Sequence, residues 1–164
     1  MAACLADRGI QTFGVETDSE KLALLKKGAV PYYEFGLQEI FARCLKTKRL
    51  EITDDHQKAV ESSEVTFITV GTPSNPDGSI SLRQVEVACN SIGLALRRTR
   101  QYHLVIIRST VTPGTTEQVA RPILESASDK RCGRDFGICV NPEFLREGHA
   151  VQDLSLIHIS EPTR

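Results

Sequence analysis

The sequence predicts an α/β fold in which short parallel strands alternate with helices. Strand-like runs of β-branched and aliphatic residues recur along the chain, with helically spaced apolar residues and turn formers between them. The run at 65–70 is apolar and β-branched almost throughout, which is typical of a strand buried on both faces of a parallel sheet. Strand, loop and helix in repetition form right-handed βαβ units, so we expect a doubly wound parallel sheet.

Spacing and terminal signals place each element in order. Thr17 and Glu20 form the pattern of a capping box at the start of one helix, and Gly28 is suited to end it. Pro122 is expected to kink the helix that contains it. The strands expected are 11–15, 51–53, 65–70, 104–107 and 136–140. The helices expected are 2–8 with Gly9 as its stop, 17–27, 37–45, about 81–100, 115–126 and one after Asn141-Pro142.

The composition excludes several classes of protein. The chain has 164 residues, 40% of them hydrophobic and 25% charged, with a net charge of -1, so it lacks the basic surplus of a nucleic-acid-binding protein. The longest aliphatic run, 104–107, is too short to span a membrane. The cysteines are scattered without a CxxC pair, which disfavours a metal site or a disulfide framework. A reduced, cytoplasmic setting fits this cysteine usage.

Three loops that follow predicted strands are rich in hydroxyl groups, glycine or acid. In open parallel sheets, ligands bind outside the carboxyl ends of the strands. The loops begin at Glu16-Thr17, at Gly71-Thr72-Pro73-Ser74 and at Ser109-Thr110-Val111. They indicate a nucleotide or another phosphorylated ligand.

Glu16 has the position of the acid that binds the adenosine ribose in dinucleotide-binding folds. The glycine-rich turn of such folds stands about 20 residues before that acid, and no GxGxxG occurs in this sequence. We therefore interpret residues 1–153 as an incomplete Rossmann-type NAD-binding domain that lacks its first strand and glycine-rich loop. The alternative is that Met1 is the true start and Glu16 a solvated acid.

Four segments together resemble the UDP-glucose/GDP-mannose dehydrogenase family, in particular its NAD-binding amino-terminal domain. The segments are Gly14-Val15-Glu16, Val70-Gly71-Thr72-Pro73-Ser74, Arg108-Ser109-Thr110-Val111-Thr112-Pro113-Gly114-Thr115 and Asn141-Pro142-Glu143-Phe144-Leu145-Arg146-Glu147-Gly148. The last is the most specific, and their order adds weight. The Arg108-Ser109-Thr110-Val111 form and Asp135-Phe136-Gly137 are most similar to GDP-mannose 6-dehydrogenases, then to UDP-glucose 6-dehydrogenases.

The resemblance implies an NAD-dependent enzyme that oxidises the 6-alcohol of a nucleotide sugar to the acid, through a thioester on a cysteine in a later domain. It implies a homodimer or larger assembly of the full-length enzyme. Its cofactor-binding residues would be Glu16, Lys21, Gly71, Thr72, Pro73, Ser74, Ser109, Thr110 and Glu147. Its catalytic residues would be Glu143, Thr110 and Glu147, with Glu143 as acid and base.

Each assignment has a plainer alternative. Glu143 and Glu147 stand four apart, which would put both on one face of the expected helix, but such pairs are usually solvated. Thr110 has the alternative of a turn or helix-capping hydroxyl, and Lys21 that of an exposed helix lysine. Glu16 favours NAD over NADP, because it would repel a 2′-phosphate.

The last eleven residues, 154–164, break the family pattern. Translated back, they match one reading frame of a transposase adapter used in preparing sequencing libraries, so we interpret them as a non-native tail. His158 and Glu161 within it supply too few ligands for a metal site. On this interpretation the chain is a fragment that lacks the catalytic cysteine and is inactive alone.

Two other functions remain open for the sequence. One is a nucleotide-binding module without chemistry, which would have no use for a carboxylate pair beside the ligand. The other is a 3-hydroxyacid-type NAD dehydrogenase, against which the octapeptide 141–148 speaks. The expected partners are a nucleotide sugar and NAD, with no nucleic acid and no membrane.

Overall fold

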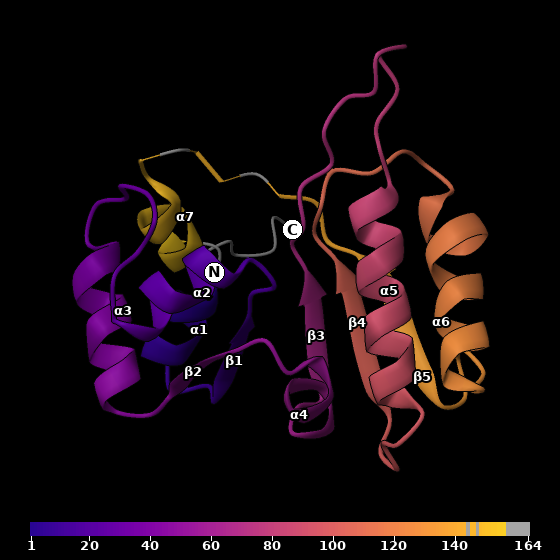
Figure 1. Ribbon diagram of the computed structural model, residues 1–164, viewed down its shortest axis with the longest axis horizontal. Helices are drawn as coiled ribbons and strands as arrows, with labels where there is room; N and C mark the ends of the chain where they lie inside the picture. Colours follow the sequence, from indigo (N-terminus) through magenta and orange to yellow (C-terminus); the bar gives the residue numbers. More distant parts are fainter. Residues whose placement is uncertain (144, 147, 157–164) are drawn as a thin grey trace, which may run out of the picture. The chain divides into compact units, whose positions relative to one another are not determined.

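The computed structural model describes residues 1–143, 145–146 and 148–156, in which parallel strands alternate with helices (Figure 1). These residues form two compact units. Unit 1 comprises Met1–Asp54 and the described residues after position 144, and unit 2 comprises Asp55–Glu143. Each unit has its own parallel sheet and its own apolar core. The predicted parallel α/β class is confirmed, with the strands divided between two sheets.

Unit 1 is built on a two-stranded parallel sheet, in which Thr12 pairs with Leu50. Its strands are β1 (Thr12–Val15) and β2 (Leu50–Thr53), and its helices are α1 (Ala2–Asp7), α2 (Ser19–Lys26), α3 (Leu37–Lys46) and α7 (Ala150–Leu156). The apolar face of α3 and two alanines of α1 supply most of its core. The buried core residues are Ala3, Ala6, Leu37, Phe41, Cys44 and Leu50.

The predicted end of helix α2 is confirmed, but its predicted capping residue is wrong. Asp18, rather than Thr17, caps the amino end, where its Oδ1 accepts the N–H groups of Glu20 and Lys21, each at 3.0 Å. These hydrogen bonds, first of all that from Lys21, lower the pKa of Asp18. Gly28 follows the carboxyl end as predicted, with a φ of +83° that suits glycine.

Unit 2 is built on the parallel sheet β3-β4-β5, with Val65 opposite Leu104 and His103 opposite Phe136. Its strands are β3 (Val65–Ile68), β4 (His103–Ile107) and β5 (Phe136–Val140). Its helices are α4 (His56–Glu61), α5 (Arg83–Leu96), the π-helix η1 (Thr116–Ala120) and α6 (Arg121–Ser128). Helices α5 and α6 stand side by side in front of the sheet in Figure 1, and the main core lies between them and the strands.

Near Pro122, where a kink was predicted, the helix changes type. Thr116–Ala120 is π-helical, and α6 continues from Arg121 with Pro122 in its first turn. Proline has no N–H to donate to the preceding turn, and its ring crowds the carbonyl four residues back. A wider π turn before Pro122 accommodates both effects.

A helix follows Asn141-Pro142, but the prediction that it includes Glu143 is wrong. Residues 141–143 and 145–146 are not helical, and α7 begins at Ala150. The Asn141 N–H instead bonds to the Ile107 carbonyl at 2.9 Å, which extends the β4-β5 ladder. The following proline also disfavours helical backbone at Asn141. Glu143 therefore lies in a segment that is neither helix nor strand, and it does not stand on the expected helical face.

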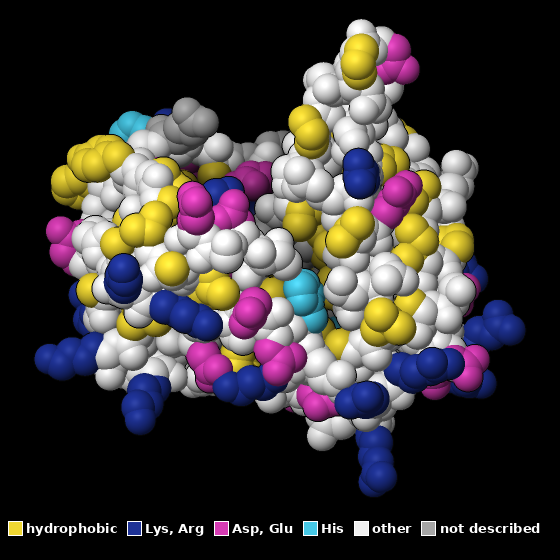
Figure 2. All heavy atoms as spheres, in the orientation of Figure 1, with side chains coloured by type: hydrophobic (Ala, Val, Ile, Leu, Met, Phe, Trp, Pro, Cys, Tyr) yellow, Lys and Arg dark blue, Asp and Glu magenta, His cyan; other side chains and the backbone are white. Residues whose placement is uncertain are grey.

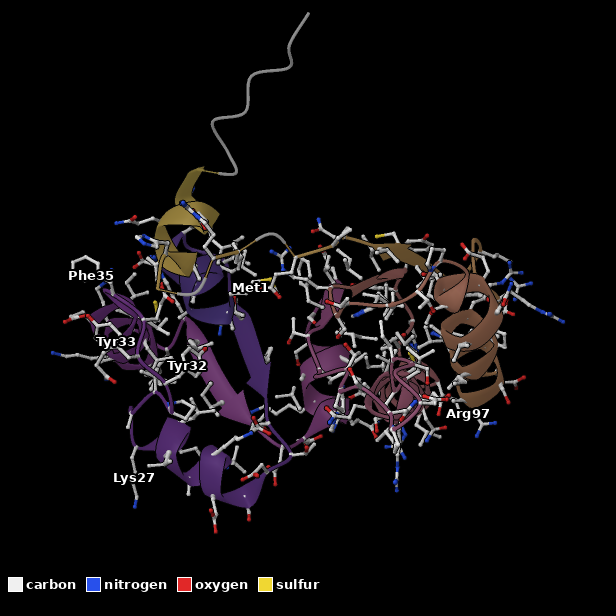
Figure 3. All side chains as sticks on the ribbon, turned by 90° about the horizontal axis from the view of Figure 1, so that it is seen from above. Met1, Lys27, Tyr32, Tyr33, Phe35 and Arg97 are labelled. Atoms are coloured by element: carbon white, nitrogen blue, oxygen red, sulfur yellow. The ribbon has the colours of Figure 1, made fainter. Side chains whose placement is uncertain are left out.

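Hydrophobic side chains lie among polar ones on the face of the molecule shown in Figure 2. Helix α5 itself leaves Val87 and Leu94 exposed. Figure 3 shows Tyr33 and Phe35 on the outside of unit 1, in the loop before α3. Within the described residues, every helix is too short or too polar to cross a membrane.

Candidate functional site

The carboxyl edge of the β3-β4-β5 sheet carries most of the residues predicted to form the site. Because the strands are parallel, the loops that follow them leave at this same edge. The loop after β3 holds Gly71–Ser74, the loop after β4 holds Ser109 and Thr110, and the segment after β5 holds Glu143. The fold thus brings these predicted residues to one edge of one sheet.

Ser109 joins the loop after β4 to the loop after β3. Its N–H bonds to the Ile68 carbonyl at 3.1 Å, and its Oγ donates to the Val70 carbonyl at 2.6 Å. Ser109 is buried, whereas the side chain of its neighbour Thr110 is exposed. The hydroxyl of Ser109 therefore stabilises the loop that leads to Gly71, and Thr110 is accessible to a ligand.

The loop after β3 leaves the sheet as a long hairpin, which projects from the carboxyl end of β3 in Figure 1. Two backbone bonds close it, from Ser81 N–H to the Pro73 carbonyl at 2.8 Å and from Asn75 N–H to the Ser79 carbonyl at 2.7 Å. Thr72 is half-buried at its base, while Gly71 and Ser74 are exposed. The glycine and hydroxyl groups are thus presented at the edge where a ligand is expected.

A hollow of about 540 Å³ lies between the loop after β4, the start of η1 and the end of β5. Its wall combines aliphatic side chains, such as Val111 and Ile138, with the polar groups of Thr112, Glu117 and Cys139. Its volume falls in the range of small-ligand pockets. Thr110 and Asn141 directly adjoin its lining residues in the chain, and sequence reasoning did not identify the hollow.

Glu16 and Lys21 lie in unit 1, at the carboxyl end of β1 and in the first turn of α2. The Oε1 of Glu16 accepts the N–H of Asp18 at 2.9 Å, which orients the carboxylate at the end of the strand. The Lys21 side chain is exposed. Glu16 thus has the strand-end position that was predicted for an acid that binds a ribose.

The octapeptide 141–148 is only partly described. Glu143 is exposed, and Glu147, a predicted catalytic and cofactor-binding residue, lies outside the described residues. Arg146 forms a bidentate ion pair with Asp153, with nitrogen–oxygen distances of 2.8 and 3.2 Å. This hydrogen bonding from Arg146 lowers the pKa of Asp153 to about 2. The predicted domain boundary at 153 thus falls within α7. Most of the predicted tail, 157–164, lies outside the residues that the structure describes.

Arg108 and Asn141 are the polar residues of this edge to which sequence reasoning gave no role. The Nη1 of Arg108 donates to Oδ1 of Asn141 at 2.8 Å, across the carboxyl ends of β4 and β5. The position of Arg108, directly after the aliphatic run 104–107, was a signal in the sequence that its side chain has a polar partner at the strand ends. In the part of the chain that the structure describes, no group of His, Cys, Asp and Glu could hold a metal ion.

The family model for the NAD binding domain of the UDP-glucose/GDP-mannose dehydrogenase family matches residues 1–158. The GDP-mannose 6-dehydrogenase of Pseudomonas aeruginosa is 44% identical over 152 residues, which are 93% of this chain and 35% of that protein. A UDP-glucose 6-dehydrogenase of Haloferax volcanii is 42% identical over 153 residues, again 35% of its length.

Solved structures of the same kind match the fold. A ternary complex of GDP-mannose dehydrogenase from Pseudomonas aeruginosa superimposes with a TM-score of 0.91 over 93% of this chain and 35% of that one. A UDP-glucose dehydrogenase from Pyrobaculum islandicum, 38% identical, gives 0.87 over the same shares. The chain therefore spans about a third of the length of these relatives, and it belongs to the UDP-glucose/GDP-mannose dehydrogenase family, whose NAD binding domain it matches.

Proposed function

We propose that this chain is the cofactor-binding part of an NAD-dependent nucleotide-sugar 6-dehydrogenase that acts on GDP-mannose or UDP-glucose. The observation that carries the proposal is the carboxyl edge of the β3-β4-β5 sheet. It presents the loop of Thr72, the exposed Thr110 and the segment after β5 that holds Glu143, in a chain of this family. The residues before 154 would be the native part, and those from 154 on the adapter-derived tail.

The residues present fit NAD in type. The carboxylate of Glu16, held at the end of β1 by Asp18, would accept hydrogen bonds from the adenosine ribose. Lys21, one turn along, would lie at the adenosine end. In unit 2, the backbone and hydroxyls of Gly71, Thr72, Pro73 and Ser74, with Ser109 and Thr110 beside them, would run under the rest of the cofactor.

The proposed chemistry assigns the proton to Glu143. When bound, NAD accepts the hydride that leaves the carbon of the sugar 6-alcohol. The hydroxyl proton must leave as well, and a carboxylate within hydrogen-bond reach takes it. Glu143 is exposed, so its carboxylate is accessible to a substrate. Thr110 would orient the hydroxyl or a water molecule, and Glu147 would contact both cofactor and substrate.

Other parts of the proposal concern the whole protein. The full-length enzyme would be a homodimer or larger assembly in the cytoplasm, and the thioester-forming cysteine would lie outside this chain. All five cysteines of the chain are free thiols, and burial raises the pKa of Cys89 to about 11 and raises the pKa of Cys44. A buried thiol with a raised pKa is a poor nucleophile, which supports this expectation for both.

The test is to express the chain together with its flanking coding sequence and to measure NADH formation with GDP-mannose and with UDP-glucose. Turnover with either sugar supports the proposal, and absence of turnover with every nucleotide sugar refutes it. In the active protein, Glu143→Gln should lower kcat by roughly 100-fold or more while NAD affinity stays nearly unchanged, since only the proton acceptor is removed.

Glu39→Gln is the matched control for that variant. Glu39 is an exposed glutamate in the first turn of α3, and the substitution makes the same chemical change in unit 1. Its kcat should remain that of the parent. If Glu143→Gln also keeps the parent kcat, Glu143 is not the proton acceptor, even though the enzyme class would stand.

A further inference from the structure

Arg108 is a charged residue whose side chain is buried at the end of strand β4. It directly follows β4 and is 6% exposed, and its backbone N–H bonds to the Ile68 carbonyl of β3 at 2.9 Å. Its Nη1 donates to Oδ1 of Asn141, directly after β5, at 2.8 Å. One residue therefore links the carboxyl ends of all three strands of the unit 2 sheet.

Within the described part of the chain, no carboxylate pairs with this buried guanidinium. Among the described residues, none of the ion pairs involves Arg108, and its buried Nε has no hydrogen-bond partner. Burying a charge without an ionic partner is strongly unfavourable, so this guanidinium is not explained by packing alone. The neutral oxygen of Asn141 is the side-chain group that it contacts.

The contact fixes the backbone that leads to Glu143. Asn141 is held twice, by its N–H on the Ile107 carbonyl at 2.9 Å and by Arg108 on its side chain. Pro142 follows, and its ring fixes φ near -65° and restricts the residue before it. Because Pro142 fixes one backbone angle, the orientation of Asn141 restricts the direction that the backbone takes at Glu143.

We propose that Arg108 is a positioning residue, which holds Asn141 and so sets the direction in which the Glu143 carboxylate faces the substrate. The proposal rests on the function proposed above, in which Glu143 accepts the proton. A planar guanidinium defines both the distance and the direction of the bond to Asn141, and the point charge of a lysine would not do so. A misplacement of about 1 Å of a reacting group lowers turnover by as much as about 100-fold.

The contact itself is tested on the 164-residue chain, independently of activity. The Nη1 protons of Arg108 should give a resolved, slowly exchanging NMR signal, because the guanidinium is buried and Nη1 donates to Asn141. Asn141→Leu should broaden or remove that signal, and Asn141→Asp, which keeps an acceptor oxygen, should retain it. A signal unchanged in Asn141→Leu would overturn the proposal, because the contact would then not hold the guanidinium.

The consequence for turnover is tested in the full-length enzyme. Arg108→Met and Asn141→Leu should each lower kcat by roughly 10- to 100-fold with KM for NAD nearly unchanged, since they misdirect Glu143 without touching the cofactor loops. The double variant should lose no more than either single variant, because both remove one contact. Arg108→Lys should recover little of the loss, and Asn141→Asp should keep most of the turnover.

Arg97→Met is the matched control. Arg97 is exposed at the end of α5, as Figure 3 shows, and its replacement should leave kcat unchanged. Losses that multiply in the double variant, or a fully active Arg108→Met, would overturn the positioning role. A parent enzyme without turnover would refute the proposed function instead. Because Asn141 is exposed, Asn141→Leu keeps the test open if Arg108→Met fails to fold.

Discussion

Two buried polar side chains lie at opposite ends of strand β4. His103 begins the strand and is 2% exposed, and Arg108 follows its last residue. The imidazole Nε2 of His103 forms a hydrogen bond with Oγ1 of Thr66 at 2.8 Å. Burial lowers the pKa of His103, the positive charge of Lys130 lowers it further, and a bond to the Ser63 backbone opposes both. The neutral imidazole is therefore the form that the fold accommodates.

This lowered pKa predicts a loss of stability in mild acid. The unfolded chain takes up a proton at the ordinary histidine pKa of about 6.5, and the folded chain does so at lower pH. The contribution of His103 to the free energy of unfolding is thus complete above about pH 6.5. It declines as the pH falls from there toward the pKa of His103 in the folded chain. Urea unfolding between pH 5 and 8 should show a shallower pH dependence for His103→Gln than for the parent.

His149→Gln is the control for this measurement, because His149 is exposed and the substitution also removes one imidazole. It should keep the slope of the parent. An equal reduction of the slope in both variants would show that the dependence does not arise from burial of His103.

Residues such as these mark a limit of sequence reasoning. Glu16, Thr72 and Thr110 could be placed at strand ends because parallel strands put their following loops at one edge. The burial of Arg108 could not, because arginines are mostly surface residues and the pattern of the chain does not show which one is enclosed. The position of Glu143 on a helix was wrong for a related reason, since the N–H of Asn141 is taken by a tertiary contact.

At the scale of elements, the strands and the helices α1, α2 and α3 were predicted to within about two residues, whereas α4 was missed. The strand at 136–140 has the predicted bounds, and the one at 104–107 is longer by a residue, because their aliphatic runs are long enough to define a period. Helix α4 was missed, since six residues are too few for an apolar stripe. Asp55 caps it by accepting the Lys58 N–H at 2.9 Å, and an aspartate is among the residues preferred at this capping position.

Helices α5 and α6 meet at a position that requires glycine. A Cβ on Gly93 would lie 2.6 Å from Cβ of Ala127 and 3.3 Å from the carbonyl oxygen of Leu124, on the neighbouring helix. Contacts of this length force the helices apart or distort them. The missing side chain therefore allows α5 and α6 to approach closely over the core of unit 2.

Gly93→Ala should lower the free energy of unfolding by about 1 to 2 kcal/mol. Overpacking costs about 1 to 3 kcal/mol, and the better helix propensity of alanine returns up to about 1 kcal/mol. Urea unfolding at pH 7.5 measures the difference. Asn90→Ala, an exposed substitution in the same helix, should be neutral or slightly stabilising. If the contact with Ala127 is the cause, Gly93→Ala with Ala127→Gly should recover part of the loss.

At the scale of the whole molecule, the two units differ in how much apolar surface they bury. The core of unit 2 includes large side chains from three elements, such as Leu96, Ile107 and Phe136, each 0% exposed. The core of unit 1 depends on Phe41 and Leu37 with small alanines, and α2 buries none of its residues. Because apolar burial supplies most of the stability, unit 1 should open more readily than unit 2.

Hydrogen exchange read by mass spectrometry should therefore show faster exchange in β1 and β2 than in β4 and β5. Phe41→Ala removes the largest core side chain of unit 1, at about 3 to 5 kcal/mol, and should accelerate exchange in residues 12–53 while 103–140 remain protected. Leu96→Ala is the counterpart for unit 2, at about 2 to 5 kcal/mol, and should accelerate exchange in 103–140. If either variant accelerates both regions equally, the chain opens as a single cooperative body, and protection would then report global unfolding rather than the separate core of each unit.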